Sequence, residues 1–232
     1  MITLVLLPGM DGTGTLFKPF VEMLRVGFNV KVVRYPATEA MGYTELEAVA
    51  RAELPTEGPF VILGESFSGP VAIALAASCS SQLKGLILCC SFARNPYPFF
   101  SGFKYFVGAL PISKVPRSVL SYFLLGPFAT DALRLALLRA IAQVSPSAFR
   151  ARFKAVLTAN VSEKLSAITV PILYMRASQD RVVPRSSSRH ISLLNPRTRI
   201  VDIEAPHFLL QAAPAEAAQV VSTFVKQVEN SL

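Results

Sequence analysis

Residues 59–69 read PFVILGESFSG, an apolar run followed by a turn of small residues around Ser66. The segment PVAIALAA comes next and has the small-residue composition of a closely packed helix. When a strand, a sharp turn and a helix follow one another, the residue at the tip of the turn takes a strained backbone conformation. Its side chain then stands free at the carboxyl edge of the sheet. The stretch therefore predicts that Ser66 is exposed as a candidate nucleophile.

The stretch departs from the pattern G-x-S-x-G, because Ser68 occupies the second glycine position and Gly69 follows it. One alternative is an ordinary tight turn into a helix, whose exposed serine has no chemical role. Ser68 is a weaker candidate for the nucleophile, since it lies one helical step past the tip of the turn. We expect its hydroxyl either to tighten the packing behind the turn or to lie near the site.

The composition indicates one α/β domain with room for an inserted subdomain. Of the 232 residues, 52% are hydrophobic, and the mean hydropathy of +0.45 indicates an apolar surface or groove. The apolar runs are interrupted well before the roughly 18 residues that a membrane span needs. The start, MITLVLLPG, lacks the basic region of a signal peptide. We therefore expect a cytoplasmic protein.

The cysteines do not suggest a metal site. Cys79, Cys89 and Cys90 lack the spacing of metal ligands, and His190 and His207 are the chain's two histidines. We expect buried thiols and no bound metal or other cofactor.

Apolar runs alternate with helical patterns along most of the chain. Strands are predicted at residues 2–7, 29–36, 60–63, 83–93, 170–180 and 198–206, and helices at 43–54 and 185–194 and from Pro214 onward. This order predicts right-handed crossovers and an α/β fold with a mostly parallel sheet of about six strands and helices on both faces. Ligands in such sheets bind at the carboxyl ends of the strands.

A glycine-rich turn, PGMDGTG at residues 8–14, follows the first strand. The dinucleotide pattern G-x-G-x-x-G fails because Phe17 stands where its last glycine belongs, and no GK[ST] follows. We therefore expect an anion pocket of backbone N–H groups beside Ser66, and no nucleotide or nucleic-acid partner.

The pattern changes between residues 94 and 165, where helices and aromatic residues replace the strands. This segment holds ten of the 23 Lys and Arg but two of the 15 Asp and Glu, so it carries the whole formal net charge of +8. It also holds eleven of the 22 Phe and Tyr. We predict a core formed by residues 1–93 and 166–232, with a helical cap (lid) at 94–165 inserted between two strands.

The excess of basic residues in the predicted cap suggests weak contact with an anionic lipid surface, or binding of an anionic leaving group. The alternative is a solvated basic face whose aromatic side chains are turned to the core.

A serine hydroxyl needs a base to take its proton, and the base needs an acid to orient it. His207 directly follows the last strand and so lies on the same edge as Ser66. His190 lies within a predicted helix among Ser and Arg residues, where we expect a surface position. His207 is therefore the predicted base.

Asp180 ends the preceding strand at the turn SQDRVVP and is the predicted acid. Asp202 and Glu204 lie inside the last strand and Asp131 lies in the cap. Asp180 could instead cap the helix that follows the turn.

The chain order Ser66, Asp180, His207 is that of α/β-hydrolases. Together with the motifs LLPGMDGTG, GESFSG, SQDRVVP and APHFLLQ, it resembles this superfamily along nearly its whole length. The chain looks most like the carboxylesterase and lipase branch with a helical cap, although the first two antiparallel strands of that family have no counterpart. The resemblance implies an oxyanion hole formed by the backbone N–H groups of Met10 and Phe67.

The resulting hypothesis is a carboxylic ester hydrolase that acts on an apolar acyl ester, a small-molecule substrate, through the Ser-His-Asp triad and an acyl-enzyme. An acyltransferase or thioesterase would use the same triad, and a catalytically weak ligand-binding protein would use the same fold. Epoxide and haloalkane hydrolases need Asp at the position of Ser66, which argues against them. The sequence makes no prediction about the oligomeric state.

Overall fold

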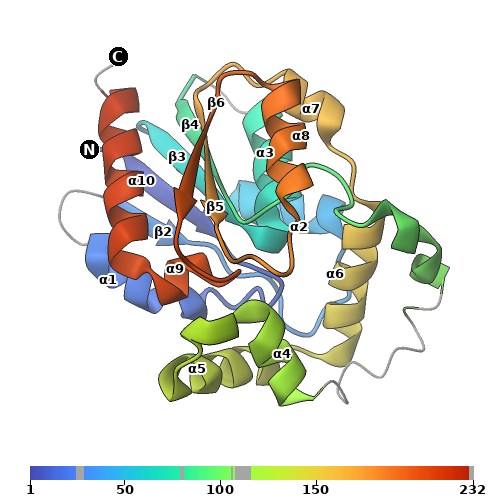
Figure 1. Ribbon diagram of the computed structural model, residues 1–232. Coiled ribbons are helices and arrows are strands. Elements are labelled where there is room, and N and C mark those ends of the chain that lie inside the picture. Colours follow the sequence, from blue (N-terminus) through green and yellow to red (C-terminus); the bar gives the residue numbers. More distant parts are fainter. Residues whose placement is uncertain (25–28, 79–80, 106, 108–115, 230–232) are drawn as a thin grey trace.

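The computed structural model describes the 232-residue chain except residues 25–28, 79–80, 106, 108–115 and 230–232. At its centre lies a six-stranded sheet of order β2-β1-β3-β4-β5-β6, in which every neighbouring pair is parallel (Figure 1). The strands are β1 (Thr3–Leu7), β2 (Asn29–Val32), β3 (Phe60–Glu65), β4 (Leu83–Cys89), β5 (Ile172–Ala177) and β6 (Thr198–Ile203). The predicted α/β fold with six parallel strands is confirmed.

Helices cover both faces of the sheet, which explains why central strands such as β1 and β3 are buried and largely apolar. Leu4 and Leu6 of β1 pack with α1 (Lys18–Leu24), α9 (Leu209–Ala212) and α10 (Pro214–Glu229). Val5 and Leu7 point the other way, because successive side chains of a strand alternate. They pack in the cluster that contains residues of α2 (Tyr43–Ala52), α3 (Gly69–Ser78) and α8 (Arg185–Leu194).

The segment between β4 and β5 is helical. It contains the 3-10 helices η3 (Pro98–Tyr105) and η6 (Gly126–Phe128), and the α-helices α4 (Arg117–Leu124), α5 (Asp131–Ala142), α6 (Pro146–Thr158) and α7 (Ser162–Ser166). Two further 3-10 helices, η1 (Thr15–Phe17) and η2 (Ser66–Ser68), follow β1 and β3. The side chain of Ser145 accepts a hydrogen bond from the N–H of Ala148, which caps the start of α6, and Pro146 occupies the first helical position.

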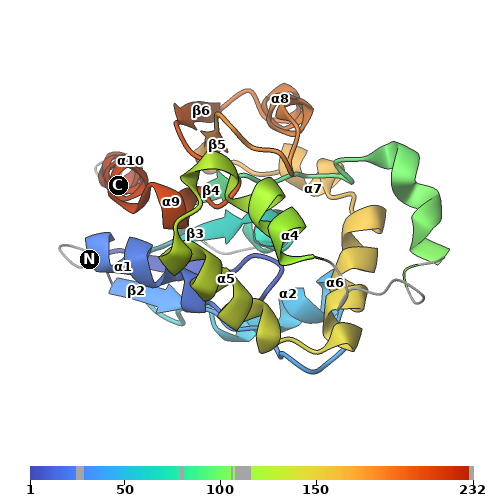
Figure 2. The same ribbon diagram turned by 60° about the horizontal axis from the view of Figure 1, so that its bottom comes forward.

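The helices of this segment occupy two different places. In Figures 1 and 2, α4 and α5 lie across the carboxyl edge of the sheet. By contrast, α6 and α7 contribute Ala155 and Leu165 to the core cluster on the α2–α3 face. The division of the chain into a core and a cap at residues 94–165 remains a prediction.

Arg152 of α6 is buried and anchors the turn after β1. Its Nη1 donates to the carbonyls of Met10 and Asp11 at 2.9 and 2.8 Å, and its Nη2 donates to that of Pro36 at 2.8 Å. A Cβ at Gly12 would come within 2.6 Å of this guanidinium, and Gly12 has a φ of +69°. The guanidinium of Arg152, one of the basic residues between 94 and 165, therefore holds the glycine-rich turn at residues 8–14 in place.

Cys89 and Cys90 are buried free thiols, as predicted, and the prediction for Cys79 lies outside the described residues. No helix in the described part of the chain has the length and apolar character that crossing a bilayer requires.

Candidate active site

Ser66, His207 and Asp180 form a continuous hydrogen-bonded chain at the carboxyl edge of the sheet. Ser66 Oγ lies 2.8 Å from His207 Nε2, and His207 Nδ1 lies 2.9 and 3.0 Å from the two carboxylate oxygens of Asp180. Ser66 has a φ of 48°, the strained conformation predicted for the tip of the turn. The structure thus brings together the three residues that the sequence singled out.

Close approaches around the turn require glycine at two positions. A Cβ at Gly64 would lie 2.7 Å from the Cβ of Ala72, and one at Gly69 would lie 1.8 Å from Ser91 Oγ. The glycine is therefore needed at position 69 rather than at 68. Ser68 is fully buried, and its hydroxyl bonds to the Pro8 carbonyl and to the hydroxyl of Tyr35. Of the two roles considered for Ser68, it has the packing role.

Asp180 is held as a carboxylate. Burial by itself would raise its pKa, but His207 and the N–H groups of Val182 and Val183 hold the pKa below its usual range. These two N–H groups donate to one carboxylate oxygen at 2.8 and 2.9 Å. The turn SQDRVVP therefore fixes the orientation of the side chain that faces the histidine.

The other candidate acids and the second histidine lie elsewhere. Asp202 pairs with both Nε and Nη2 of Arg176, and Asp131 pairs with Arg134 on α5. Glu204 is exposed just beyond β6. The imidazole of His190, on α8, is half-buried and contacts Ser162 Oγ at 3.1 Å.

The peptide groups Gly9–Met10 and Ser66–Phe67, which carry the N–H groups expected to form the oxyanion hole, are each held at their carbonyl oxygen by a hydrogen bond. The Gly9 carbonyl accepts from the N–H of Gly12 at 3.0 Å, and the Ser66 carbonyl accepts from Ser91 Oγ at 2.5 Å. Because a trans peptide is planar, its N–H points away from its C=O. The N–H groups of Met10 and Phe67 are therefore directed away from these anchors, and Phe67, at the start of a helix, has no partner for its N–H within that helix.

Ser91 was not predicted as a site residue. Its side chain is completely buried, and its own backbone is held by Tyr174, whose hydroxyl donates to the Ser91 carbonyl and accepts from the Ser91 N–H. Ser91 follows β4 and meets the turn only because β3 and β4 are paired. No local pattern marks this contact.

Glu65, directly before Ser66, is a second residue that the sequence did not single out. It is 6% exposed, and burial raises its pKa to about 7 despite a hydrogen bond from Gln211 Nε2 at 2.9 Å. Among the described residues, the Gln211 amide oxygen has no hydrogen-bond partner. With the amide rotated by half a turn, that oxygen would accept a hydrogen bond from protonated Glu65.

Cys90, Asp180 and His207 form the one cluster in the described chain whose ligand atoms lie close enough for a metal ion, within 4.8 Å of one another. Burial raises the pKa of the Cys90 thiol well above its usual value, so the sulfur stays protonated. Since a metal ligand must be a thiolate, and the carboxylate already bonds the imidazole, this cluster does not fit a metal.

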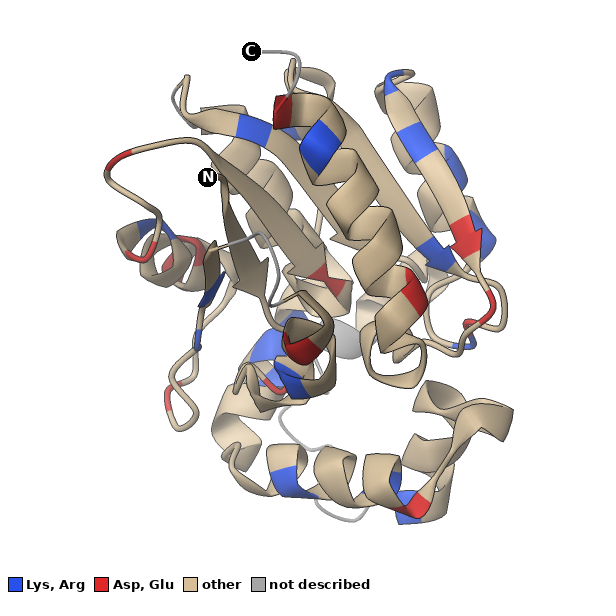
Figure 3. Ribbon diagram, turned by 90° about the vertical axis from the view of Figure 1, so that its left-hand side faces the viewer, with Lys and Arg blue, Asp and Glu red and all other residues tan. Residues whose placement is uncertain are grey.

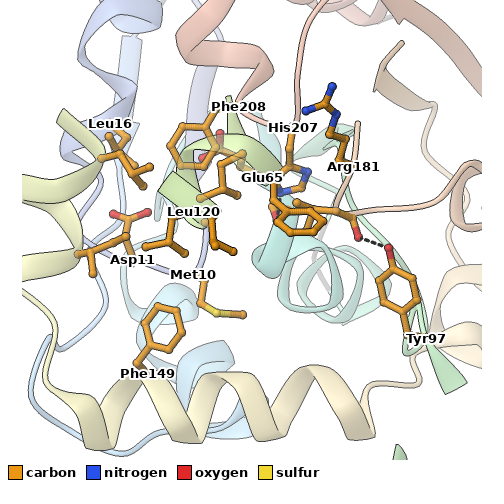
Figure 4. A pocket seen from close by; sticks show the side chains of 18 residues that line it. Met10, Asp11, Leu16, Glu65, Tyr97, Leu120, Phe149, Arg181, His207 and Phe208 are labelled. Carbon is orange, nitrogen blue, oxygen red and sulfur yellow. Dashed lines mark hydrogen bonds between the residues drawn. The ribbon is translucent and has the colours of Figure 1, made fainter. Parts of the chain in front are cut away.

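A cavity of about 450 Å³ opens beside Ser66 and His207. Figure 4 shows Met10, Glu65 and His207 around it together with apolar side chains from the α4–α6 segment. The helices contribute Leu120, Phe123, Leu137, Ile141 and Phe149. The cavity therefore offers a hydrogen-bonding end near the serine and an apolar body.

The helix α4 is attached to both loops that carry the acid and the base. Arg181, next to Asp180, donates to the Tyr122 carbonyl at 3.1 Å and lies 4.3 Å from the Tyr122 ring. The N–H of Phe208, next to His207, donates to the Leu124 carbonyl at 3.1 Å. The apolar wall of the cavity is thus tied to the triad loops.

A sequence model of the Alpha/beta hydrolase family matches residues 4–220. The chain therefore belongs to the α/β-hydrolase family, with the fold described above.

Solved structures with this fold include a carboxylesterase from Nitrososphaera gargenis, with a TM-score of 0.83 and 16% identity over 100% of this chain and 92% of that chain. A thermophilic esterase from Thermogutta terrifontis has a TM-score of 0.79 and 21% identity over 98% and 90%. A hydrolase from Oleispira antarctica has a TM-score of 0.82 and 14% identity over 97% and 91%. At these identities the likeness shows the fold.

Among curated proteins, the chloroplastic phytyl ester synthase 1 of Arabidopsis thaliana is 37% identical over 103 residues. The match takes in 40% of this chain but 15% of that protein, so it relates a part of each.

Glu65 generates a prediction about stability. Its folded-state pKa of about 7 exceeds its ordinary value of 4.5, so the native state keeps a proton that the unfolded chain has lost. The resulting stabilisation is present below pH 4.5 and is lost as the pH rises through 7. Between these values, wild type should lose roughly 3 kcal/mol of unfolding free energy relative to Glu65→Gln, which cannot titrate. Urea unfolding at a series of pH values measures this difference.

The exposed Glu57 provides the matched control, since Glu57→Gln should follow the wild-type pH dependence. Parallel stability curves for wild type and Glu65→Gln would show that this carboxyl does not titrate abnormally.

Proposed function

We propose that this protein is a carboxylic ester hydrolase that forms an acyl-enzyme on Ser66. The observation that carries the proposal is the hydrogen-bonded chain from Ser66 through His207 to Asp180, placed at the wall of an apolar cavity. Membership of the α/β-hydrolase family and the fold shared with esterases support it.

In the proposed reaction, the neutral imidazole of His207 carries its proton on Nδ1 and keeps it there, donating a hydrogen bond to the Asp180 carboxylate. Its Nε2 is then free to accept the Ser66 proton while Oγ attacks the ester carbonyl carbon. The protonated imidazole next gives that proton to the leaving alcohol. Water, deprotonated by the same nitrogen, attacks the acyl-enzyme and releases the acid and Ser66.

The negative charge of the tetrahedral intermediates would be stabilised by the N–H groups of Met10 and Phe67. Such donors act through orientation, because they are in place before the charge develops. The Gly9–Met10 peptide is held at its Gly9 carbonyl by the N–H of Gly12, and the Ser66–Phe67 peptide is held at its Ser66 carbonyl by Ser91. Buried Arg152 holds the next peptide along, at the Met10 carbonyl. The protein thus holds both donors by contacts on the far side of each peptide.

The cavity favours an apolar acyl group. Its helical wall is made of Leu, Ile and Phe side chains, and burial of apolar surface contributes roughly 25 cal/mol per Å². An acyl chain lying along α4 and α5 would keep its carbonyl at Ser66, where the polar groups of the cavity gather.

Hydrolysis of p-nitrophenyl esters over a series of acyl lengths tests the proposed function. Wild type should hydrolyse them with a length optimum set by the cavity, and Ser66→Ala should lower kcat by roughly 10⁴-fold or more. Ser192 is half-buried on α8, where its hydroxyl donates to the Arg189 carbonyl, and the control variant Ser192→Ala should keep wild-type activity. Undiminished activity of Ser66→Ala would overturn the proposal, and a wild type inactive on every ester would favour the ligand-binding alternative.

Ser91→Ala tests the alignment of the oxyanion donors. The variant leaves the Ser66 carbonyl without its Ser91 partner, whereas Tyr174 can still hold the backbone of residue 91. We expect kcat to fall about tenfold, which corresponds to about 1.4 kcal/mol of barrier, with little change in KM. An unchanged kcat would mean that this contact does not orient the Phe67 peptide.

Acyl transfer to an alcohol is the second candidate function. The partial match to a phytyl ester synthase favours it, as does the apolar wall that α4 places over the serine. Incubation with a p-nitrophenyl ester and a long-chain alcohol, followed by mass spectrometry, separates the two functions. A transferase would yield the new ester as its main product, whereas a hydrolase would yield the free acid at every alcohol concentration.

We further propose that the outer surface of α4 and α5 contacts an anionic lipid surface. Tyr122 of α4 and Leu135 of α5 are exposed there, and Val119 and Phe123, which line the cavity, are also partly exposed. Arg117, Arg134 and Arg139 are exposed on the same two helices, which form the bottom layer of Figure 3. Apolar side chains interspersed with cations are the combination that binds the interface of anionic membranes.

Vesicle sedimentation tests this contact. The double variant Arg117→Gln, Arg139→Gln should bind anionic vesicles roughly 30-fold more weakly than wild type, at about 1 kcal/mol per cation. The matched pair Lys18→Gln, Lys226→Gln removes the same charge from α1 and α10 and should bind as wild type does. Equal binding of wild type to neutral and anionic vesicles would rule out the proposed contact.

A further inference from the structure

A second cavity, of about 360 Å³, lies beside the first. It is formed between residues 92–99, which follow β4, and the first turns of α8. Tyr97 lines both cavities, and its hydroxyl donates to the Val182 carbonyl at 2.9 Å, the contact dashed in Figure 4. Tyr97 therefore forms a wall shared by the cavity at Ser66 and its neighbour.

The second cavity is lined by side chains that can donate hydrogen bonds, and its described lining contains no acidic side chain to pair with them. Arg94 lines it, and its guanidinium is exposed, with no ion pair or hydrogen bond to any described residue. Ser186 and Ser187, in the first turn of α8, also line it. The part of the lining that the structure describes contains no Asp or Glu.

Ser187 is the most informative of these residues. Its side chain is 7% exposed and faces the cavity, yet its hydroxyl makes no hydrogen bond to the described part of the chain. The hydroxyl is open to the cavity, because it is not among the buried side-chain atoms that lack a partner, and so it can bond to a group that enters the cavity. The positive end of the α8 dipole lies at the same place, because Ser187 is in the first turn of this ten-residue helix.

His190 adds an imidazole to the lining. Burial, together with the nearby charge of Arg94, lowers its pKa, so the ring is neutral at pH 7 and Arg94 carries the positive charge of the cavity. A cation, a helix N-terminus and the hydroxyl of a largely buried serine that faces the cavity without a partner in the described chain together make a site for an anionic oxygen group.

We propose that this second cavity binds a phosphate or carboxylate group carried on the leaving-group side of the ester. The assignment to a leaving group rests on the proposed function, in which the acyl chain occupies the first cavity. The carbon part of the group would lie against Phe92, Pro96 and Pro98, and its anionic end would meet Arg94 and Ser187. Arg94, the first basic residue after β4, thereby gains a role in substrate recognition.

Nuclear magnetic resonance of the two histidine rings tests binding directly, without catalysis. Inorganic phosphate, and acetate in a parallel arm, is titrated into the protein at constant ionic strength. The His190 ring signals should shift with a saturating dependence on one or both anions, while those of His207 stay in place. The arm that saturates identifies which oxygen group the cavity takes.

Arg94→Met should abolish the saturation, whereas Arg189→Met, which removes an equal charge from an exposed position on α8, should retain it. Saturation that persists in Arg94→Met, or His190 signals that no anion moves, would overturn the proposal.

A pair of esters tests the link to the substrate. Hexanoyl esters of ω-hydroxyhexanoate and of ω-hydroxyhexanamide differ in one negative charge on the leaving group. Arg94→Met should lower kcat/KM for the anionic ester about tenfold and leave the neutral ester unchanged. An equal effect on both esters would refute the leaving-group assignment. If neither ester is hydrolysed by wild type, the proposed function fails while the anion titration still decides the binding site.

Discussion

The strained backbone at Ser66 is the constraint on which the candidate site depends. A positive φ at a residue with a side chain is unfavourable and persists only where the surroundings enforce it. Here Gly64 lets α3 approach β3 closely, and Gly69 makes room for Ser91. The same close packing that strains Ser66 also holds its carbonyl, so the serine hydroxyl and the neighbouring Phe67 N–H are oriented by one set of contacts.

The parallel sheet then brings the remaining groups to this turn. Asp180 and His207 follow β5 and β6, whose carboxyl ends lie at the same edge as that of β3. Different hydrogen bonds hold the two loops. The Asp180 carboxylate accepts from two backbone N–H groups, and the N–H of Phe208, next to His207, donates to the Leu124 carbonyl of α4. The cavity wall and the triad are consequently parts of one hydrogen-bonded assembly, with apolar side chains on one side and polar groups on the other.

Much of this arrangement could be predicted from the sequence, because it depends on short-range patterns. The central strands are largely apolar runs. Ser66 directly follows one of them, and Asp180 and His207 lie within four residues of the ends of β5 and β6. By contrast, Arg152 reads as one more basic residue of an amphipathic helix, although it anchors the turn at Met10 from inside the protein. Ser91 and Glu65 likewise owe their roles to burial and to contacts between distant segments, which no local spacing records. The anion cavity depends on Arg94 and Ser187, which are far apart in sequence.

Covalent labelling tests the central claim, that the hydrogen-bonded chain activates Ser66, more directly than turnover does. The protein would be incubated with a serine-reactive fluorophosphonate and digested, and the modified peptide identified by mass spectrometry. The account predicts one adduct, on Ser66, that forms much more slowly in His207→Gln. An adduct on another serine, or labelling of Ser66 at the same rate in His207→Gln, would contradict it.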